Sequence, residues 1–164
     1  MKLNTKLLLL PCLFFSVLFF TSGNSPAGEH LKTAVFAGGC FWCMEADFEK
    51  IPGIIEVVSG YTGGTSRNPN YNNYGKSGHI EAVRIEYESS VINYRQLLDI
   101  FWVNIDPTDK GGQFCDRGHE YSSAVFFLTE EQQKMATASK TLIEQSGILS
   151  EPVKTPIIKA GEFY

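Results

Sequence analysis

The chain has 164 residues, of which 14 are Lys or Arg and 18 are Asp or Glu, so its formal net charge is −4 at pH 7. It has no basic stripe that could neutralise a phosphate backbone, which argues against nucleic acid as a partner. Its length allows one domain with a substantial core and is too short for two typical domains.

The N-terminal segment has the pattern of a targeting sequence. Lys2 and Lys6 flank the start of an apolar run at 7–20, and small, polar residues follow at 21–28. The run has the length of a signal-peptide h-region and is short for a membrane-spanning helix, which needs about 20 apolar residues. We therefore expect residues 1–28 to be a signal peptide, with a membrane anchor as the alternative, and the protein to be exported to a periplasmic or extracytoplasmic location.

The remaining residues, 29–164, are expected to form a single domain of alternating strands and helices. In chain order we predict a strand at 33–37, a helix at 40–50, strands at 54–61 and 80–87, a helix at 94–103, a strand at 121–128, a helix from 130 to about 146 and a short strand at 156–158. Two long polar loops, 62–78 and 108–120, have a length that is usually functional. This order predicts an α+β fold, a two-layer sandwich in which helices pack on a mixed β-sheet.

Local signals support several of these elements. Asn93 is suited to cap the helix at 94–103, and Thr129 with Gln132 forms a capping-box pattern before the last helix. Residues 80–87 alternate in polarity, which predicts a strand with one buried face.

Three cysteines follow the N-terminal segment, namely Cys40, Cys43 and Cys115. Export would place them in an oxidising compartment, where cysteines usually pair as disulfides. Because an odd number of cysteines cannot form a closed set of disulfides, at least one thiol is free or exchanging. The cysteine count therefore favours redox chemistry over a purely structural role.

The segment Gly38-Gly39-Cys40-Phe41-Trp42-Cys43 carries the most chemical information. Cys40 falls where a glycine turn passes into a helix, and the free N–H groups and the dipole of the helix stabilise an anion there. This position favours the thiolate, which is the nucleophilic form of cysteine. Phe41 and Trp42 are either core aromatics or the wall of an apolar substrate pocket.

Cys43 follows Cys40 by one helical turn, which suits a dithiol redox pair. A metal half-site is the other interpretation of Cys-x-x-Cys, but no second pair follows at ligand spacing, so we expect no metal site. Taken alone, the motif fits a general thiol–disulfide oxidoreductase that uses Cys40 and Cys43. That activity is the alternative function, and a non-catalytic binding domain is a third hypothesis.

Several further motifs follow Gly-Cys-Phe-Trp in the chain: Glu-x-x-Phe, Val-Ser-Gly-Tyr-Thr-Gly-Gly, Gly-His-x-Glu, Phe-Trp-x-x-x-Asp-Pro-Thr and Gly-Gly-Gln-Phe-Cys-Asp-Arg-Gly-x-x-Tyr. In this order they resemble the A-class peptide methionine sulfoxide reductases, from about Val35 to Tyr164. The resemblance implies thiol-dependent reduction of methionine sulfoxide, of the S epimer, free or in proteins. Such an activity repairs oxidative damage.

The resemblance also implies roles for individual residues. Cys40 would attack the sulfoxide sulfur, while Phe41 and Trp42 would hold the methyl group of the substrate. A second set would bind and protonate the sulfoxide oxygen or orient the substrate: Glu81 as the acid, Tyr71 and Tyr121 as hydrogen-bond donors, and Asp116 as the orienting residue. The chemistry needs such an acid, because expelling the oxygen of a neutral sulfoxide without a proton would generate a very basic anion.

The implied cycle passes through a sulfenic acid on Cys40, then a disulfide, which an external thioredoxin-like dithiol reduces. Many relatives resolve the sulfenic acid with cysteines in a C-terminal tail, and the chain ends at Tyr164, short of that tail. We therefore expect Cys43 to be the resolving cysteine, with Cys115 as the alternative. We expect no bound cofactor and a monomeric protein.

Overall fold

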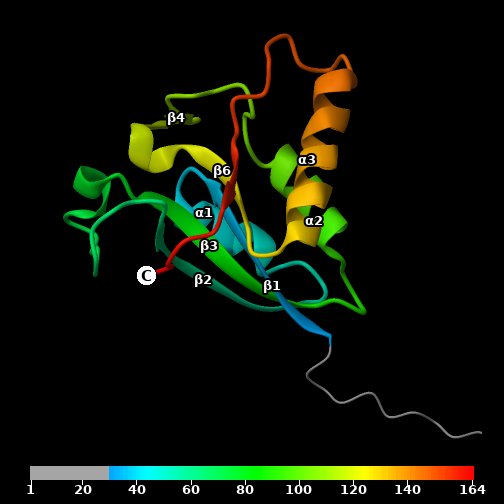
Figure 1. Cartoon of the computed structure of the whole chain (residues 1–164), viewed down its shortest axis with the longest axis horizontal. Coiled ribbons are helices and arrows are strands. Elements are labelled where there is room, and N and C mark those ends of the chain that lie inside the picture. Colours follow the sequence, from blue (N-terminus) through cyan, green and yellow to red (C-terminus); the bar gives the residue numbers. More distant parts are fainter. Residues whose placement is uncertain (1–29) are drawn as a thin grey trace, which may run out of the picture.

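A computed structural model describes residues 30–164, which form a mixed β-sheet with three α-helices packed on it (Figure 1). Within these residues the main sheet has five strands in the order β2-β3-β1-β6-β7. Neighbouring strands are antiparallel, except that β6 and β7 pair in parallel. The strands are β1 (Leu31–Gly38), β2 (Ile54–Thr62), β3 (Ile80–Glu88), β6 (Ser123–Phe127) and β7 (Ile157–Lys159), and the helices are α1 (Phe41–Phe48), α2 (Tyr94–Val103) and α3 (Glu130–Gln145). The predicted α+β fold is confirmed.

Short elements lie inside the two long loops. The first loop contains the 3₁₀ helix η1 (Tyr74–Ser77), and the second contains a two-stranded hairpin, β4 (Gly112–Gln113) with β5 (Asp116–Arg117), and the 3₁₀ helix η2 (His119–Tyr121). The prediction that a strand starts at Tyr121 is wrong. The backbone N–H of Tyr121 bonds to the carbonyl of Gly118 at 3.2 Å, and this turn delays entry into the sheet until Ser123.

Both predicted helix caps are present, but one is incomplete. Asn93 and Gln96 form a full capping box at α2, with two hydrogen bonds of 3.0 Å. At α3 the hydroxyl of Thr129 accepts from the backbone of Gln132 at 3.1 Å. The Gln132 side chain bonds to Leu128 N–H and to Thr33 carbonyl instead of closing the box, so it ties α3 to β1.

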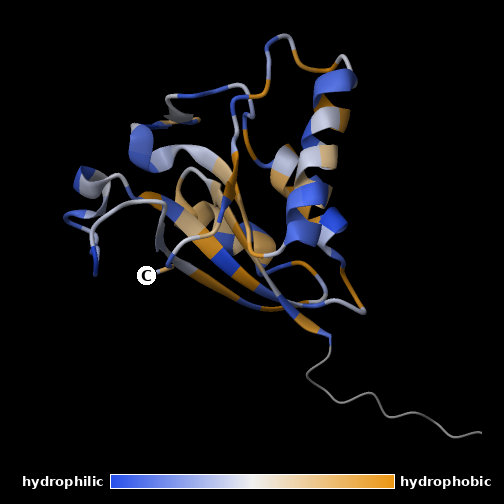
Figure 2. Cartoon of the chain, viewed as in Figure 1, coloured by the Kyte–Doolittle hydropathy of each residue, from blue (hydrophilic) through white to orange (hydrophobic). Residues whose placement is uncertain are grey.

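All three helices pack on one face of the sheet. The Phe36 ring of β1 lies 5.8 Å from Phe48 of α1 and 5.0 Å from Phe101 of α2, between ring centroids. The indole N–H of Trp102 in α2 bonds to Ser139 in α3 at 2.9 Å. Figure 2 shows strongly apolar residues concentrated on the strands, whereas α3 presents mainly polar residues. Burial of each large apolar side chain stabilises the fold by about 1.5–3 kcal/mol.

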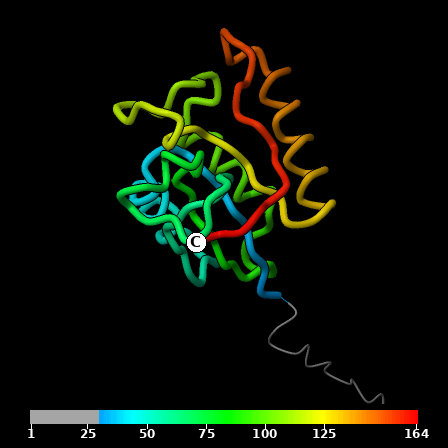
Figure 3. Tube along the Cα trace, turned by 60° about the vertical axis from the view of Figure 1, so that its left-hand side comes forward, coloured from blue at the N-terminus to red at the C-terminus, as the bar shows by residue number. Residues whose placement is uncertain are grey.

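The C-terminal segment covers the opposite face at the start of β3. Ile80 and Ala82 form a cluster there with neighbours on β1 and β6, and Phe163 packs against it. Tyr164 exchanges two backbone hydrogen bonds of 3.0 Å with Tyr61 of β2, and the chain end accordingly lies beside this part of the sheet (Figure 3). The prediction of a half-buried strand is therefore wrong for the first residues of β3, since both of their faces are covered. Glu81 lies in this segment.

None of the helices in residues 30–164 combines the length and apolar character that crossing a membrane requires. The predicted signal peptide or anchor, residues 1–28, lies outside the described residues.

Candidate active site

Cys40 occupies the turn between β1 and α1, where it is the N-cap residue of α1. Gly39 allows this turn because its φ is +87°, and a Cβ at this position would lie 2.7 Å from the Cβ of Gln113. The Cys40 carbonyl accepts the first helical hydrogen bond from Met44 at 3.2 Å. The cysteine is thus held at the positive end of the helix, where an anion is stabilised.

Glu81 is held close to Cys40 by a hydrogen bond to the backbone of Phe41, the residue that follows Cys40. The N–H of Phe41 donates to Glu81 Oε2 at 2.9 Å, and the carboxyl is only 2% exposed. Burial raises the pKa of Glu81; the hydrogen bonds from Phe41 and Tyr74 oppose this rise, and the nearby charges of Asp116 and Glu120 add to it. A carboxyl with a raised pKa that adjoins a thiol is suited to donate a proton there.

The tyrosine that touches Glu81 is Tyr74, which was not among the predicted site residues. Its hydroxyl donates to Glu81 Oε1 at 2.7 Å, so both carboxyl oxygens have a donor. Tyr121 adjoins Tyr74, whose hydroxyl lowers the pKa of Tyr121, although burial and the charges of Glu81 and Asp116 raise it overall. No sequence signal distinguishes Tyr74, because it stands in an irregular polar loop.

Tyr71 lies farther out, although the resemblance assigned it to the sulfoxide oxygen. It is 56% exposed, and its ring stacks on Trp42 with centroids 6.0 Å apart and planes at 19°. Its hydroxyl has no hydrogen bond to Glu81 in the described residues, where Tyr74 takes that place.

The two aromatics after Cys40 differ in burial. Phe41 is buried, with its ring 5.7 Å from Tyr61, whereas Trp42 is exposed and lies 5.2 Å from Phe41. Tyr61 in turn stacks on Tyr74 at 4.5 Å. The result is a continuous aromatic surface beside Cys40 and Glu81, which suits contact with an apolar group such as a methyl.

Cys43 is the second thiol near Cys40. Burial raises the pKa of Cys43, and a hydrogen bond to Cys40 and the charge of Cys40 raise it further. Both cysteines line a pocket of about 230 Å³ together with Phe114 and Asp116. Cys115 is exposed in the turn between β4 and β5 and does not line this pocket. All three thiols are free in the described residues.

The predicted site residues do not share one cavity. Cys40 and Asp116 line the pocket just described, whereas Tyr71, Tyr74 and Tyr121 line another, of about 450 Å³. Glu81 lines neither of these two pockets, and its hydrogen bonds to Phe41 and Tyr74 join their walls. The two pockets are therefore linked through the buried carboxyl of Glu81, and not by a shared cavity.

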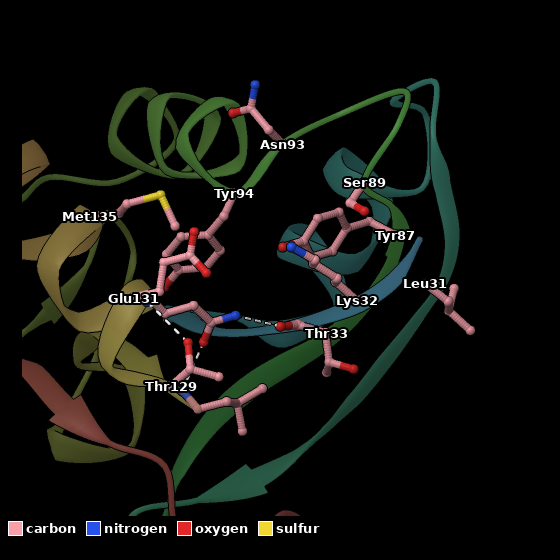
Figure 4. A pocket seen from close by; sticks show the side chains of 12 residues that line it. Leu31, Lys32, Thr33, Tyr87, Ser89, Asn93, Tyr94, Thr129, Glu131 and Met135 are labelled. Atoms are coloured by element: carbon pink, nitrogen blue, oxygen red, sulfur yellow. Dashed lines mark hydrogen bonds between the residues drawn. The ribbon is translucent and has the colours of Figure 1, made fainter. Parts of the chain in front are cut away.

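A pocket of about 580 Å³ lies elsewhere, between the start of β1 and the first turns of α2 and α3 (Figure 4). Lys32, Tyr87, Tyr94, Glu131 and Met135 are among its lining residues, and none of the predicted site residues is. Within residues 30–164 no group of three His, Cys, Asp or Glu side chains is arranged to hold a metal ion.

Comparison with known proteins places the chain among reductases. The family model described as peptide methionine sulfoxide reductase matches residues 32–164. The peptide methionine sulfoxide reductase MsrA of Bacillus licheniformis is 48% identical over 138 residues, which are 83% of this chain and 76% of that protein. MsrA of Bacillus subtilis is 49% identical over 138 residues, which are 83% of this chain and 78% of that protein.

Solved structures agree in fold. Reduced Mxr1 of Saccharomyces cerevisiae has a TM-score of 0.76 at 24% identity, over 84% of this chain and 80% of that one. Mxr1 in complex with Trx2 has a TM-score of 0.62 at 22% identity, over 88% of this chain and 86% of that one.

Proposed function

The chain belongs to the peptide methionine sulfoxide reductase family, and we propose that it reduces methionine sulfoxide by attack of the Cys40 thiolate on the sulfoxide sulfur. The observation that carries this mechanism is the 2.9 Å hydrogen bond between Phe41 N–H and Glu81. It holds a buried carboxyl with a raised pKa one residue from the attacking sulfur.

In the first step Glu81 supplies the proton that the sulfoxide oxygen needs. The Cys40 thiolate, one proton and methionine sulfoxide give a Cys40 sulfenic acid and methionine. The substrate sulfur gains two electrons and the cysteine sulfur loses two, and the oxygen ends on Cys40. Phe41 and Trp42 contact the methyl group, Tyr71 and Tyr121 complete the polar side of the site, and Asp116 orients the substrate.

In the second step Cys43 condenses with the sulfenic acid to form a disulfide and water. A hydrogen bond and the charge of Cys40 raise the pKa of Cys43 in the resting protein. Oxidation of Cys40 removes that charge, so Cys43 then loses its proton more readily and becomes the nucleophile. Cys43 is favoured over Cys115 because it shares the pocket of Cys40.

In the third step an external dithiol reduces the disulfide between Cys40 and Cys43. Cys43 is exposed, so a protein thiol has access to its sulfur. A complex of the related Mxr1 with Trx2 supports a thioredoxin-like protein as this reductant. No bound cofactor takes part in this cycle. We also propose a monomer that acts on the S epimer and, from the sequence of residues 1–28, an exported location.

Purified protein with a peptide containing both sulfoxide epimers and dithiothreitol tests this function. We expect methionine to form until the S epimer is used up, with the R epimer left unreacted. Cys40→Ser should form no methionine, and Cys115→Ser should act like the parent protein. Reduction of insulin disulfides without any methionine formation would support the general thiol–disulfide oxidoreductase instead.

A further inference from the structure

Tyr74 is held firmly against Glu81. It begins η1, is only 7% exposed, and its ring stacks on Tyr61 at 4.5 Å between centroids. Its backbone is fixed at both ends, by a 3.0 Å bond from its N–H to the Asn70 carbonyl and a 3.2 Å bond from His79 N–H to its own carbonyl. This geometry leaves its hydroxyl little freedom to leave the carboxyl 2.7 Å away.

A second tyrosine lies next to Tyr74 on the side away from the acid. Tyr121 and Tyr74 each affect the pKa of the other, so their hydroxyls are close. Tyr121 is half-buried and lines the open pocket of about 450 Å³ together with Tyr74. Tyr74 therefore stands between this pocket and the buried acid.

The acid is almost closed off from water, so its orientation depends on its protein neighbours. In the proposed function each turnover removes one proton from Glu81, and at 2% exposure this carboxyl has almost no contact with water. Phe41 N–H covers its other oxygen and donates a proton that a backbone amide does not release. Both carboxyl oxygens are thus held by donors, Oε2 by Phe41 and Oε1 by Tyr74.

We infer that Tyr74 is the positioning residue of Glu81: its hydroxyl bond to Oε1 holds the carboxyl in the orientation from which it donates its proton. This inference rests on the proposed function, because it needs Glu81 to act as the acid.

Tyr74→Phe tests the inference while keeping the ring stacked on Tyr61. We expect kcat for methionine formation to fall about 10- to 100-fold, the effect of losing one hydrogen bond to an ionisable group, with KM changed less than about 2-fold. Tyr164→Phe is the matched control, since its hydroxyl bonds only to Glu162 among the described residues, and it should keep the parent kcat.

The pH profile separates positioning from general damage. The groups that act on Glu81 are Phe41 N–H on α1, Tyr61 on β2, Tyr74 on η1, Asp116 on β5, and Glu120 and Tyr121 on η2. Of these, Phe41 N–H and Tyr74 lower the pKa of Glu81, so loss of the Tyr74 hydroxyl should shift the alkaline limb of kcat to higher pH.

A double variant shows whether Tyr74 acts through Glu81. If it does, Tyr74→Phe in a Glu81→Gln background should be no slower than Glu81→Gln alone. The inference would be overturned if Tyr74→Phe kept the parent kcat and the parent alkaline limb. It would also be overturned if Tyr74→Phe lowered kcat by the same factor in the Glu81→Gln background as in the parent protein. In both cases the parent protein still forms methionine. Failure of the parent protein to form methionine would instead refute the proposed function.

Discussion

The backbone N–H of Phe41 and the carboxyl of Glu81 are joined by a 2.9 Å hydrogen bond that links the first turn of α1 to β3. The N–H is one of the donors that a helix N-terminus leaves without an intrahelical partner. Glu81 satisfies it and so holds the acid at the same helix end as Cys40. Burial still raises the pKa of Glu81, so the carboxyl combines a fixed position with a retained proton.

Glu81→Gln should remove the proton donor and leave the shape of the site. Loss of general acid catalysis typically costs about 100-fold or more in rate, and we expect that loss in kcat. The alkaline limb of the pH profile should flatten because no acid remains to titrate. Steady-state methionine formation between pH 6 and pH 9 measures both effects, and a variant with the parent limb would show that another group is the acid.

The same substitution should change how stability depends on pH. Burial raises the pKa of Glu81 in the folded state above its unfolded value, so its stabilising effect is lost as pH rises through the folded pKa. Gln does not ionise, and the free energy of unfolding of Glu81→Gln relative to the parent should therefore increase with pH. Urea denaturation at several pH values tests this, and parallel curves for the two proteins would contradict it.

Cys43→Ser should separate sulfoxide reduction from recycling. The variant should release one methionine per protein as the parent does, but its sulfenic acid should persist and react with dimedone. Turnover with a thioredoxin-like reductant should then fall about 10-fold or more, because no disulfide forms for it to attack. Cys115→Ser is the control, and a loss of recycling there with Cys43→Ser unaffected would identify Cys115 as the resolving cysteine.

Phe114→Asn should stabilise the protein. Phe114 has φ +51° in the turn between β4 and β5 and is 67% exposed, so its backbone is strained with little burial in return. Asn adopts this conformation more readily, and we expect the free energy of unfolding to rise by about 0.5–1 kcal/mol. Val91→Asn is the control at an exposed site with negative φ, and equal effects of both substitutions would exclude relief of strain as the cause.

The order of the five strands of the main sheet and the three α-helices could be predicted from the sequence because their signals are local. Gly38 and Gly39 marked the turn before α1, and Asn93 and Thr129 marked the starts of α2 and α3. Each of these features depends on neighbouring residues alone, so no tertiary contact was needed to predict it.

The surroundings of Glu81 depend on distant residues and could not be predicted in the same way. The alternation in β3 indicated one buried face, but Phe163, 82 positions after Glu81 in the chain numbering, helps to cover the other. Tyr74 reaches the carboxyl only because η1 turns it inward, and no periodic pattern marks a 3₁₀ turn in a polar loop. The resemblance pointed to Tyr71, which the fold places against Trp42.

Mass spectrometry after a single turnover without reductant tests the central claim most directly. One equivalent of methionine sulfoxide should yield one equivalent of methionine and a protein two hydrogens lighter, with Cys40 and Cys43 in one disulfide-linked peptide. Cys40→Ser should yield neither product. Methionine formed by Cys40→Ser, or a parent protein that forms methionine with Cys40 unchanged, would contradict the account.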